Sequence, residues 1–172
     1  MSVIAFITAV LAEEPPLSLS ISIPSSPSGE HELDDGRIPH FHIILLNSSD
    51  RPQRVWAPWS EASDSVLTFE FTNEEGKKWT VRRKFLERVS HQLPEVSVLQ
   101  PHESLVFNIY YANTNVWENF PKAMPGYPAV AMRAIFEIRS NPGTELNKVW
   151  AGKIVSEPLK VTIYPWEPRK DK

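Results

Sequence analysis

Short apolar segments that repeat every two residues, separated by polar and proline-rich turns, are the feature that most limits how this chain can fold. Successive side chains of a strand point to opposite faces, so this rhythm indicates strands with one buried and one wet face. In Leu17 to Ile23, leucine and isoleucine alternate with Ser18, Ser20 and Ser22. The chain has 16 prolines, about twice the usual share, and they fall mainly between apolar runs.

The firmest local prediction is a β-hairpin around Gly76. Residues 67–71 and 79–81 both alternate, and the stretch 73–76 between them ends in this glycine, which can adopt the left-handed conformation of a tight turn. The denser run 41–46 is apolar on both faces and suits a central strand. Pro158 lacks an N–H donor and predicts a bulge or an edge. Further strands are expected within 96–99, 105–111, 130–138, 149–155 and 159–163.

These segments predict an all-β fold, a single immunoglobulin-like Greek-key β-sandwich of about seven to nine strands. A small barrel is the alternative. Residues 84–93 alone have apolar side chains at helical spacing, so at most one short helix is expected. No internal repeat is visible, which argues against a solenoid or a propeller.

The sandwich is expected to span residues 13–164, with segments of another kind at both ends. Residues 3–12 are apolar and end in a small-x-small pattern, which indicates a signal peptide with a cleavage site after Ala12. They are too few to span a bilayer, which takes about 20 apolar residues. An N-terminal strand or overhang is the alternative. We therefore predict export to the periplasm or beyond, and a disordered tail over 165–172.

Composition excludes several classes of protein. The chain contains no cysteine, so disulfides, cysteine nucleophiles and thiolate metal sites are ruled out. Its net charge is −3 and its lysines and arginines are scattered, which argues against nucleic-acid binding. It lacks G-x-S-x-G, S-x-x-K, H-E-x-x-H and phosphate-binding glycine loops. We predict that the chain is not an enzyme, has no catalytic residues and needs no cofactor.

Two histidines form the sharpest candidate metal site. His40 and His42 are two apart on an expected strand and so project to one face, where His31, Asp34 or Asp35 could supply a third ligand for zinc or copper. The alternative is two polar side chains on the wet face of a strand whose Phe41 points inward. We favour this alternative and predict no metal.

Three tryptophans are the candidate binding residues. Trp56, Trp59 and Trp117 fall in expected loops, where exposed indole rings can stack on sugars or capture peptides. The alternative is that they fill the space between the sheets, as we expect Trp79 to do because it alternates with Lys78 and Thr80.

Three stretches carry a family resemblance. They are 46–52 ahead of Val55-Trp56, 99–105 with its L-x-P-x-E-S pattern, and 132–138 together with 149–156. Together they resemble an uncharacterised family of exported bacterial proteins with an immunoglobulin-like fold. In such domains the second stretch commonly has glycine where this chain has His102. The resemblance implies fold and compartment and no activity. Within the third stretch, we expect Trp150 to pack near a sheet edge beside Gly152.

The function predicted from sequence is that of an exported, non-catalytic accessory or interaction domain. It would bind a partner through loops or a sheet edge. The partner would be a protein or a polymer such as a glycan. One alternative is a carbohydrate-binding module that uses the three tryptophans. Another is an immunoglobulin-like proteinase inhibitor, which would be cytoplasmic. We expect no nucleic-acid partner and no stable membrane span, and the sequence leaves the oligomeric state open.

Overall fold

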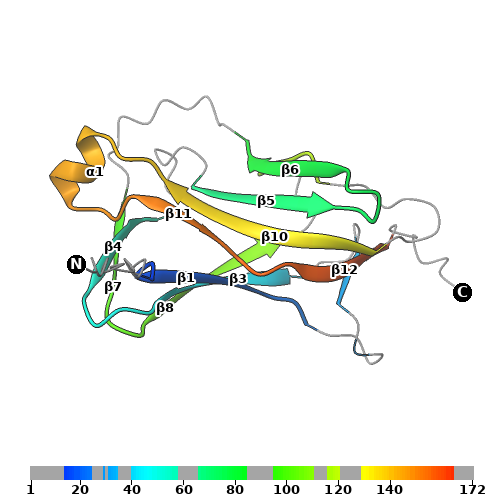
Figure 1. Cartoon of the computed structure of the whole chain (residues 1–172), viewed down its shortest axis with the longest axis horizontal. Coiled ribbons are helices and arrows are strands. Elements are labelled where there is room, and N and C mark those ends of the chain that lie inside the picture. The colour runs from blue at the N-terminus through cyan, green and yellow to red at the C-terminus, as the bar shows by residue number, and fades with distance from the viewer. Residues whose placement is uncertain are drawn as a thin grey trace, which may run out of the picture.

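The computed structural model describes residues 14–24, 29, 31–34, 40–57, 66–84, 95–110, 116–120 and 129–164. Within these ranges the chain forms 12 strands and one short helix (Figure 1). Their bounds are β1 Leu17–Ser22, β2 Glu32–Asp34, β3 His40–Asn47, β4 Gln53–Trp56, β5 Leu67–Thr72, β6 Lys78–Arg83, β7 Val96–Leu99, β8 Ser104–Tyr110, β9 Trp117–Glu118, β10 Ala129–Ile138, α1 Pro142–Asn147, β11 Gly152–Val155 and β12 Leu159–Tyr164.

The strands form two stacked sheets and a small ribbon. The first sheet has the order β1-β3-β8, and the second has the order β2-β12-β10-β5-β6-β9 with β11 also paired to β10. β4 and β7 pair with each other in a separate two-stranded ribbon. All pairs are antiparallel except β12 with β2. β1, β3 and β8 thus occupy the positions of strands A, B and E of an immunoglobulin domain, and β12, β10, β5 and β6 those of G, F, C and C′. The predicted immunoglobulin-like β-sandwich is confirmed.

The strand count exceeds the predicted seven to nine because β2, β4 and β9 are added. Each has only two to four residues. With three and two residues, β2 and β9 are too short to display a period of two, which needs four or more residues to be seen. β4 has four residues but does not alternate, because Val55 and Trp56 are both buried. These three segments are recognised as strands only by the strands with which they pair.

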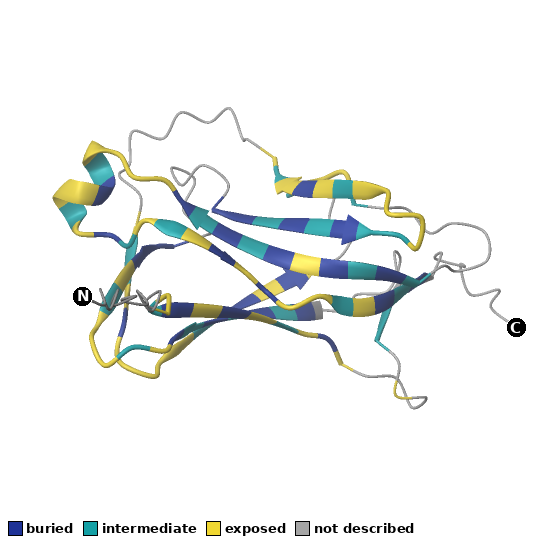
Figure 2. Ribbon diagram, in the orientation of Figure 1, coloured by how far each residue is buried: buried dark blue, intermediate teal, exposed yellow. Residues whose placement is uncertain are grey.

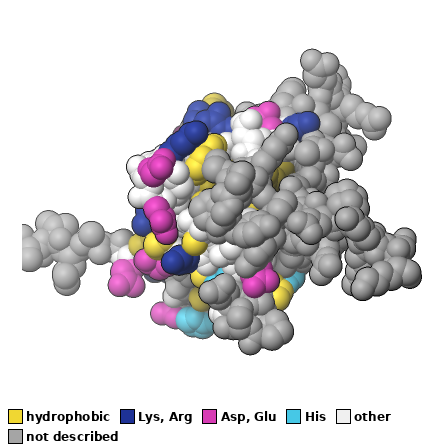
Figure 3. Space-filling view, turned by 90° about the vertical axis from the view of Figure 1, so that its right-hand side faces the viewer, with side chains coloured by type: hydrophobic (Ala, Val, Ile, Leu, Met, Phe, Trp, Pro, Cys, Tyr) yellow, Lys and Arg dark blue, Asp and Glu magenta, His cyan; other side chains and the backbone are white. Residues whose placement is uncertain are grey.

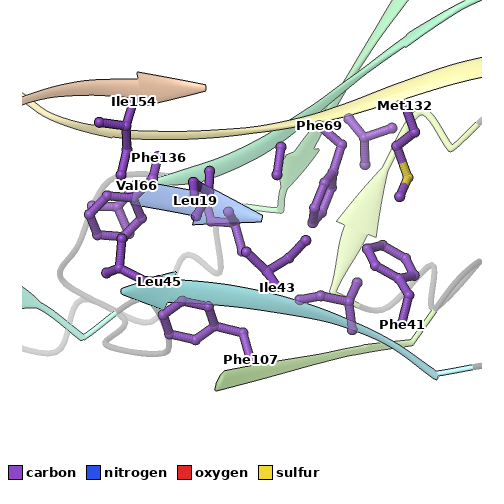
Figure 4. Packing of buried hydrophobic residues seen from close by; sticks show 14 of the residues in the cluster. Leu19, Phe41, Ile43, Leu45, Val66, Phe69, Phe107, Met132, Phe136 and Ile154 are labelled. Carbon is purple, nitrogen blue, oxygen red and sulfur yellow. The ribbon is translucent and has the colours of Figure 1, made fainter. Parts of the chain in front are cut away.

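The core lies between the two sheets, where every second side chain of β3, β5 and β10 is buried (Figure 2). Phe41 and Ile43 of β3 face Phe69 of β5 and Phe136 of β10, and all four are fully buried (Figure 4). The rings of Phe41 and Phe69 meet edge to face with centroids 5.4 Å apart. Burial of one such side chain is worth about 1.5–3 kcal/mol, so this layer holds the sheets together. The dense run 41–46 forms most of β3, which is the central strand of its sheet, as predicted.

A bulge joins β11 to β12. Ile135 pairs with Val155 and Met132 with Leu159, so two residues of β10 face three residues of the other strand. The buried Ser156 fills the gap in the ladder: its N–H donates to the carbonyl of Ala134 at 2.9 Å, and its hydroxyl oxygen accepts from the N–H of Ala134 at 2.9 Å. The predicted bulge at Pro158 is therefore confirmed.

The β5–β6 hairpin also matches its prediction. Gly76 has a φ of 80°, in the left-handed region that favours glycine. Its N–H donates to the carbonyl of Asn73, and the N–H of Asn73 donates to the carbonyl of Lys77, each at 3.0 Å.

The helix α1 was not predicted. It lies between β10 and β11, where Asn141 caps it by accepting hydrogen bonds from the N–H groups of Gly143 and Thr144, and Pro142 stands in its first turn. Residues 85–93, where a helix was expected, lie outside the described residues, as do 1–12 and 165–172. None of the described helices is long and apolar enough to cross a membrane.

Candidate functional site

The predicted tryptophan site does not form an exposed platform. Trp56 is 6% exposed and Trp117 is 8% exposed. Trp117 packs edge to face on Phe69, with ring centroids 5.2 Å apart, and on Phe120 at 6.3 Å. The expectation of exposed indole rings is wrong for both residues, because β4 and β9 turn them into the core. Trp59 lies outside the described residues.

Of the candidate metal ligands, the structure describes the side chains of His42 and His31. Nδ1 of His42 lies 2.8 Å from Oδ1 of Asn108, a hydrogen-bonding distance. His31 adjoins β2, which belongs to the opposite sheet. Among the described residues there is no group of three or more side chains able to hold a metal ion. The side chains of His40 and Asp34, and the whole of Asp35, lie outside the described residues.

The stretch with His102 in place of glycine builds a tight turn between β7 and β8. The N–H of Glu103 donates to the carbonyl of Gln100 at 3.0 Å, and His102 has a φ of 62°. Pro101 ahead of a left-handed residue is typical of a type II turn. His102 thus adopts the left-handed backbone conformation that glycine would have at this position.

The buried amide of Asn47 ties this turn to the end of β3. Its Nδ2 donates to the carbonyls of Arg51, Leu99 and Gln100 at 2.8, 3.0 and 3.0 Å, and its Oδ1 accepts from the N–H of Ser49. These hydrogen bonds hold three chain segments together at one end of the sandwich. Their role is structural.

The feature that does suggest binding is the outer face of the first sheet. The pairing of β3 with β1 and with β8 aligns nine outward side chains in three rows across the sheet. We call these nine residues the β1-β3-β8 face. Its rows are Ser18–Leu46–Ser104, Ser20–Ile44–Val106 and Ser22–His42–Asn108.

The β1-β3-β8 face contains no lysine, arginine, aspartate or glutamate. Its centre is apolar, with Ile44 and Leu46 half-buried and Val106 50% exposed. Serines, Asn108 and His42 surround that centre. An apolar centre depleted of charge within a polar border is typical of a protein–protein interface.

The outer face of the second sheet is different. Its ladder includes the ion pairs Lys78–Glu70, with Nζ 3.1 Å from Oε1, and Lys153–Glu137, with Nζ 3.8 Å from Oε2. Basic and acidic side chains also lie side by side at the end of the molecule seen in Figure 3. Such a face is well solvated. Its charged residues include Glu70, Lys78, Arg82, Glu118, Arg133, Glu137, Lys153 and Lys160.

Sequence reasoning missed the β1-β3-β8 face, although one sign of it was visible. The alternating serines of β1 indicate an outer surface without charge. The other two strands of the face, β3 and β8, pair with residues twenty or more positions away in the sequence, and the sequence does not say that they pair.

Comparisons with known proteins add a distant likeness. No protein-family model matches the chain, and no curated protein matches it in sequence. A solved structure, the ASH / PapD-like domain of human CEP192 (PapD-like domain 7), is similar at 12% identity and a TM-score of 0.34, over 98% of this chain and 99% of that chain. At so low a score the two backbones differ in detail, and the strand order of this chain is what identifies its immunoglobulin-like fold. The resemblance to an exported bacterial family stays a prediction.

Proposed function

We propose that this chain is a non-catalytic interaction domain that binds a protein partner through its β1-β3-β8 face. The observation that supports the proposal is the contrast between the two outer faces of the sandwich. The outer face of the second sheet carries charged side chains, some of them in ion pairs, whereas the β1-β3-β8 face carries no lysine, arginine, aspartate or glutamate and exposes Val106.

The chemistry of the face favours a partner surface that is itself poor in charge. A charged group pressed against Ile44 and Leu46 would lose its hydration and find no counter-charge there. The serine hydroxyls of β1 can both donate and accept hydrogen bonds, so they suit polar but uncharged groups at the border of the contact. Export of the domain, expected from residues 1–12, belongs to the same proposal.

A photo-crosslinking amino acid in place of Ser20 tests the proposal. The same amino acid in place of Thr80, an exposed residue on the outer face of β6, is the matched control. We expect crosslinks to a discrete partner from position 20 and none to that partner from position 80. Equal crosslinking from both positions would show that no particular face is used.

The partner so identified is then purified and its affinity measured. We expect Ser20→Lys and Ile44→Lys each to weaken binding roughly tenfold, because a lysine would be desolvated opposite an uncharged surface. Thr80→Lys should leave the affinity unchanged. An affinity unaffected by both substitutions on the β1-β3-β8 face would contradict the proposal.

A further inference from the structure

The outer edge of β8 offers main-chain groups of Ser104, Val106 and Asn108 that pair with no described strand. The N–H of Asn47 donates to the carbonyl of Glu103 at 3.0 Å, which sets the alternation of the β3–β8 ladder. In an antiparallel pair the main-chain groups of every second residue point to the partner and the others point away. The main-chain groups of Leu105 therefore point to β3. The main-chain groups of Ser104, Val106 and Asn108 point away from β3, to the outer edge of the sheet.

No strand of the described chain pairs with β8 on that side. In an immunoglobulin domain strand D lies there, next to strand E. The strand that precedes β8 here is β7, which pairs with β4 instead. The position beside β8 is thus open among the described residues.

Natural proteins usually protect such an edge with lysine, proline, a bulge or a very short strand. β8 is seven residues long and reads Ser-Leu-Val-Phe-Asn-Ile-Tyr, without a charged residue or a proline. An edge of this kind is competent to pair with another strand.

Residues 104–108 of β8 are chemically symmetric about Val106. Polar Ser104 and Asn108 stand two residues to either side of it, and apolar Leu105 and Phe107 stand next to it. In an antiparallel pair centred on this valine, Val106 would face its own copy, and Ser104 would face Asn108 of the second molecule. Within residues 104–108 polar residues then meet polar residues and apolar residues meet apolar ones, as a two-fold symmetric interface requires.

We propose that the occupant of this edge is β8 of a second copy of the chain, paired antiparallel about Val106. The two three-stranded sheets become one continuous sheet. Facing residues whose main-chain groups point away from β3 exchange two main-chain hydrogen bonds per pair. Although each copy has a net charge of −3, the strands that meet carry no charge, so repulsion at the contact is small. The contact uses the edge of the strand, and it therefore stands apart from partner binding on the β1-β3-β8 face.

An edge contact is smaller than the ~1,200 Å² of a standard stable interface, so we expect reversible self-association instead of a permanent dimer. Sedimentation velocity over a wide range of protein concentration should show the mass rising from monomer to dimer. Amide exchange should slow at Val106 and Asn108 in the concentrated sample. A monomeric mass at every concentration, with unchanged exchange at both residues, would overturn the proposal.

Charge substitutions at the centre of symmetry test the register. In Val106→Lys, and separately in Val106→Glu, like charges meet across the two-fold axis, and we expect self-association to weaken roughly fivefold. Mixing the two variants places opposite charges face to face and should restore pairing. Val106 is half exposed at an edge, so both variants are expected to fold, which circular dichroism checks.

Ser20→Lys is the matched control, since it adds the same charge to the same row but two strands away. It should block the partner of the β1-β3-β8 face and leave self-association unchanged. Equal weakening by Ser20→Lys and Val106→Lys, or no recovery in the Lys–Glu mixture, would contradict edge pairing. Neither result would bear on partner binding, which is measured separately.

Discussion

Trp150 occupies the space that a side chain at position 152 would need. A Cβ atom placed on Gly152 would lie 2.5 Å from Cζ2 of Trp150, closer than real Cβ contacts come. The indole ring is stacked on Phe136 with centroids 6.3 Å apart and an interplanar angle of 20°. The predicted packing of Trp150 beside Gly152 is confirmed, and glycine is required there because the ring lies directly against the backbone.

Gly152→Ala should therefore lower the free energy of unfolding by about 1–3 kcal/mol, since the added methyl group must push the indole off Phe136. Urea denaturation measures the change. In a Trp150→Leu background the same substitution should cost clearly less, because the ring that it strikes is gone. An equal cost in both backgrounds would mean that the ring is not the obstacle.

His102→Gly should stabilise the protein by up to about 1 kcal/mol. A non-glycine residue in the left-handed region lowers stability by roughly 1–2 kcal/mol. The net gain from glycine is smaller than this, because glycine has more conformational freedom in the unfolded chain and loses more of it on folding. The contact between His102 and Asp50 at 3.6 Å contributes little, because the two side chains are 70% and 99% exposed. His102→Ala is the control and should bring no gain. If alanine stabilises as much as glycine, backbone strain is not the cause.

Asn47→Ala should cost about 2–4 kcal/mol, because three carbonyl groups lose the amide that donates to them. The position is fully buried. Thermal or urea unfolding measures the loss, and Ser48→Ala at the exposed neighbouring position should be nearly neutral.

Asn47→Asp adds a dependence on pH. A carboxylate buried among carbonyl oxygens is disfavoured, so its pKa in the folded state should rise above the ~3.9 of the unfolded chain. A raised carboxyl pKa lowers stability as the pH increases past the unfolded value, and the penalty disappears in acid. Asn47→Asp should thus be less stable than Asn47→Ala at neutral pH, with the gap closing towards pH ~4. A gap independent of pH would contradict this picture.

Trp117→Ala should cost about 3–5 kcal/mol, the usual loss for removing a large buried aromatic side chain. Trp79→Ala is the comparison: its ring is only partly buried, and Nζ of Lys77 lies 5.3 Å from the ring centroid, so its removal should cost less. Denaturant titration of both variants decides between a core role and the predicted binding role. A fully stable Trp117→Ala variant would argue against the core role.

Local order was largely predictable from the residues. The alternation in β1, β5 and β10, the glycine of the β5–β6 turn and the proline of the β11–β12 bulge each act over a few neighbouring residues. Their effect on the backbone does not depend on what the chain does elsewhere. The small helix α1 was missed because six residues are too few to reveal a period of 3.6.

What the amino-acid sequence alone determined is the longer strands, which side of each is apolar, and hence the sandwich. Which strands become neighbours was decided only in the folded protein. Ser20, Ile44 and Val106 form one row, Asn47 reaches the β7–β8 turn, and Trp117 packs on Phe69, all through contacts between distant segments. Burial and pairing depend on the whole packed core, and a period of two says which way a side chain points without saying what it meets.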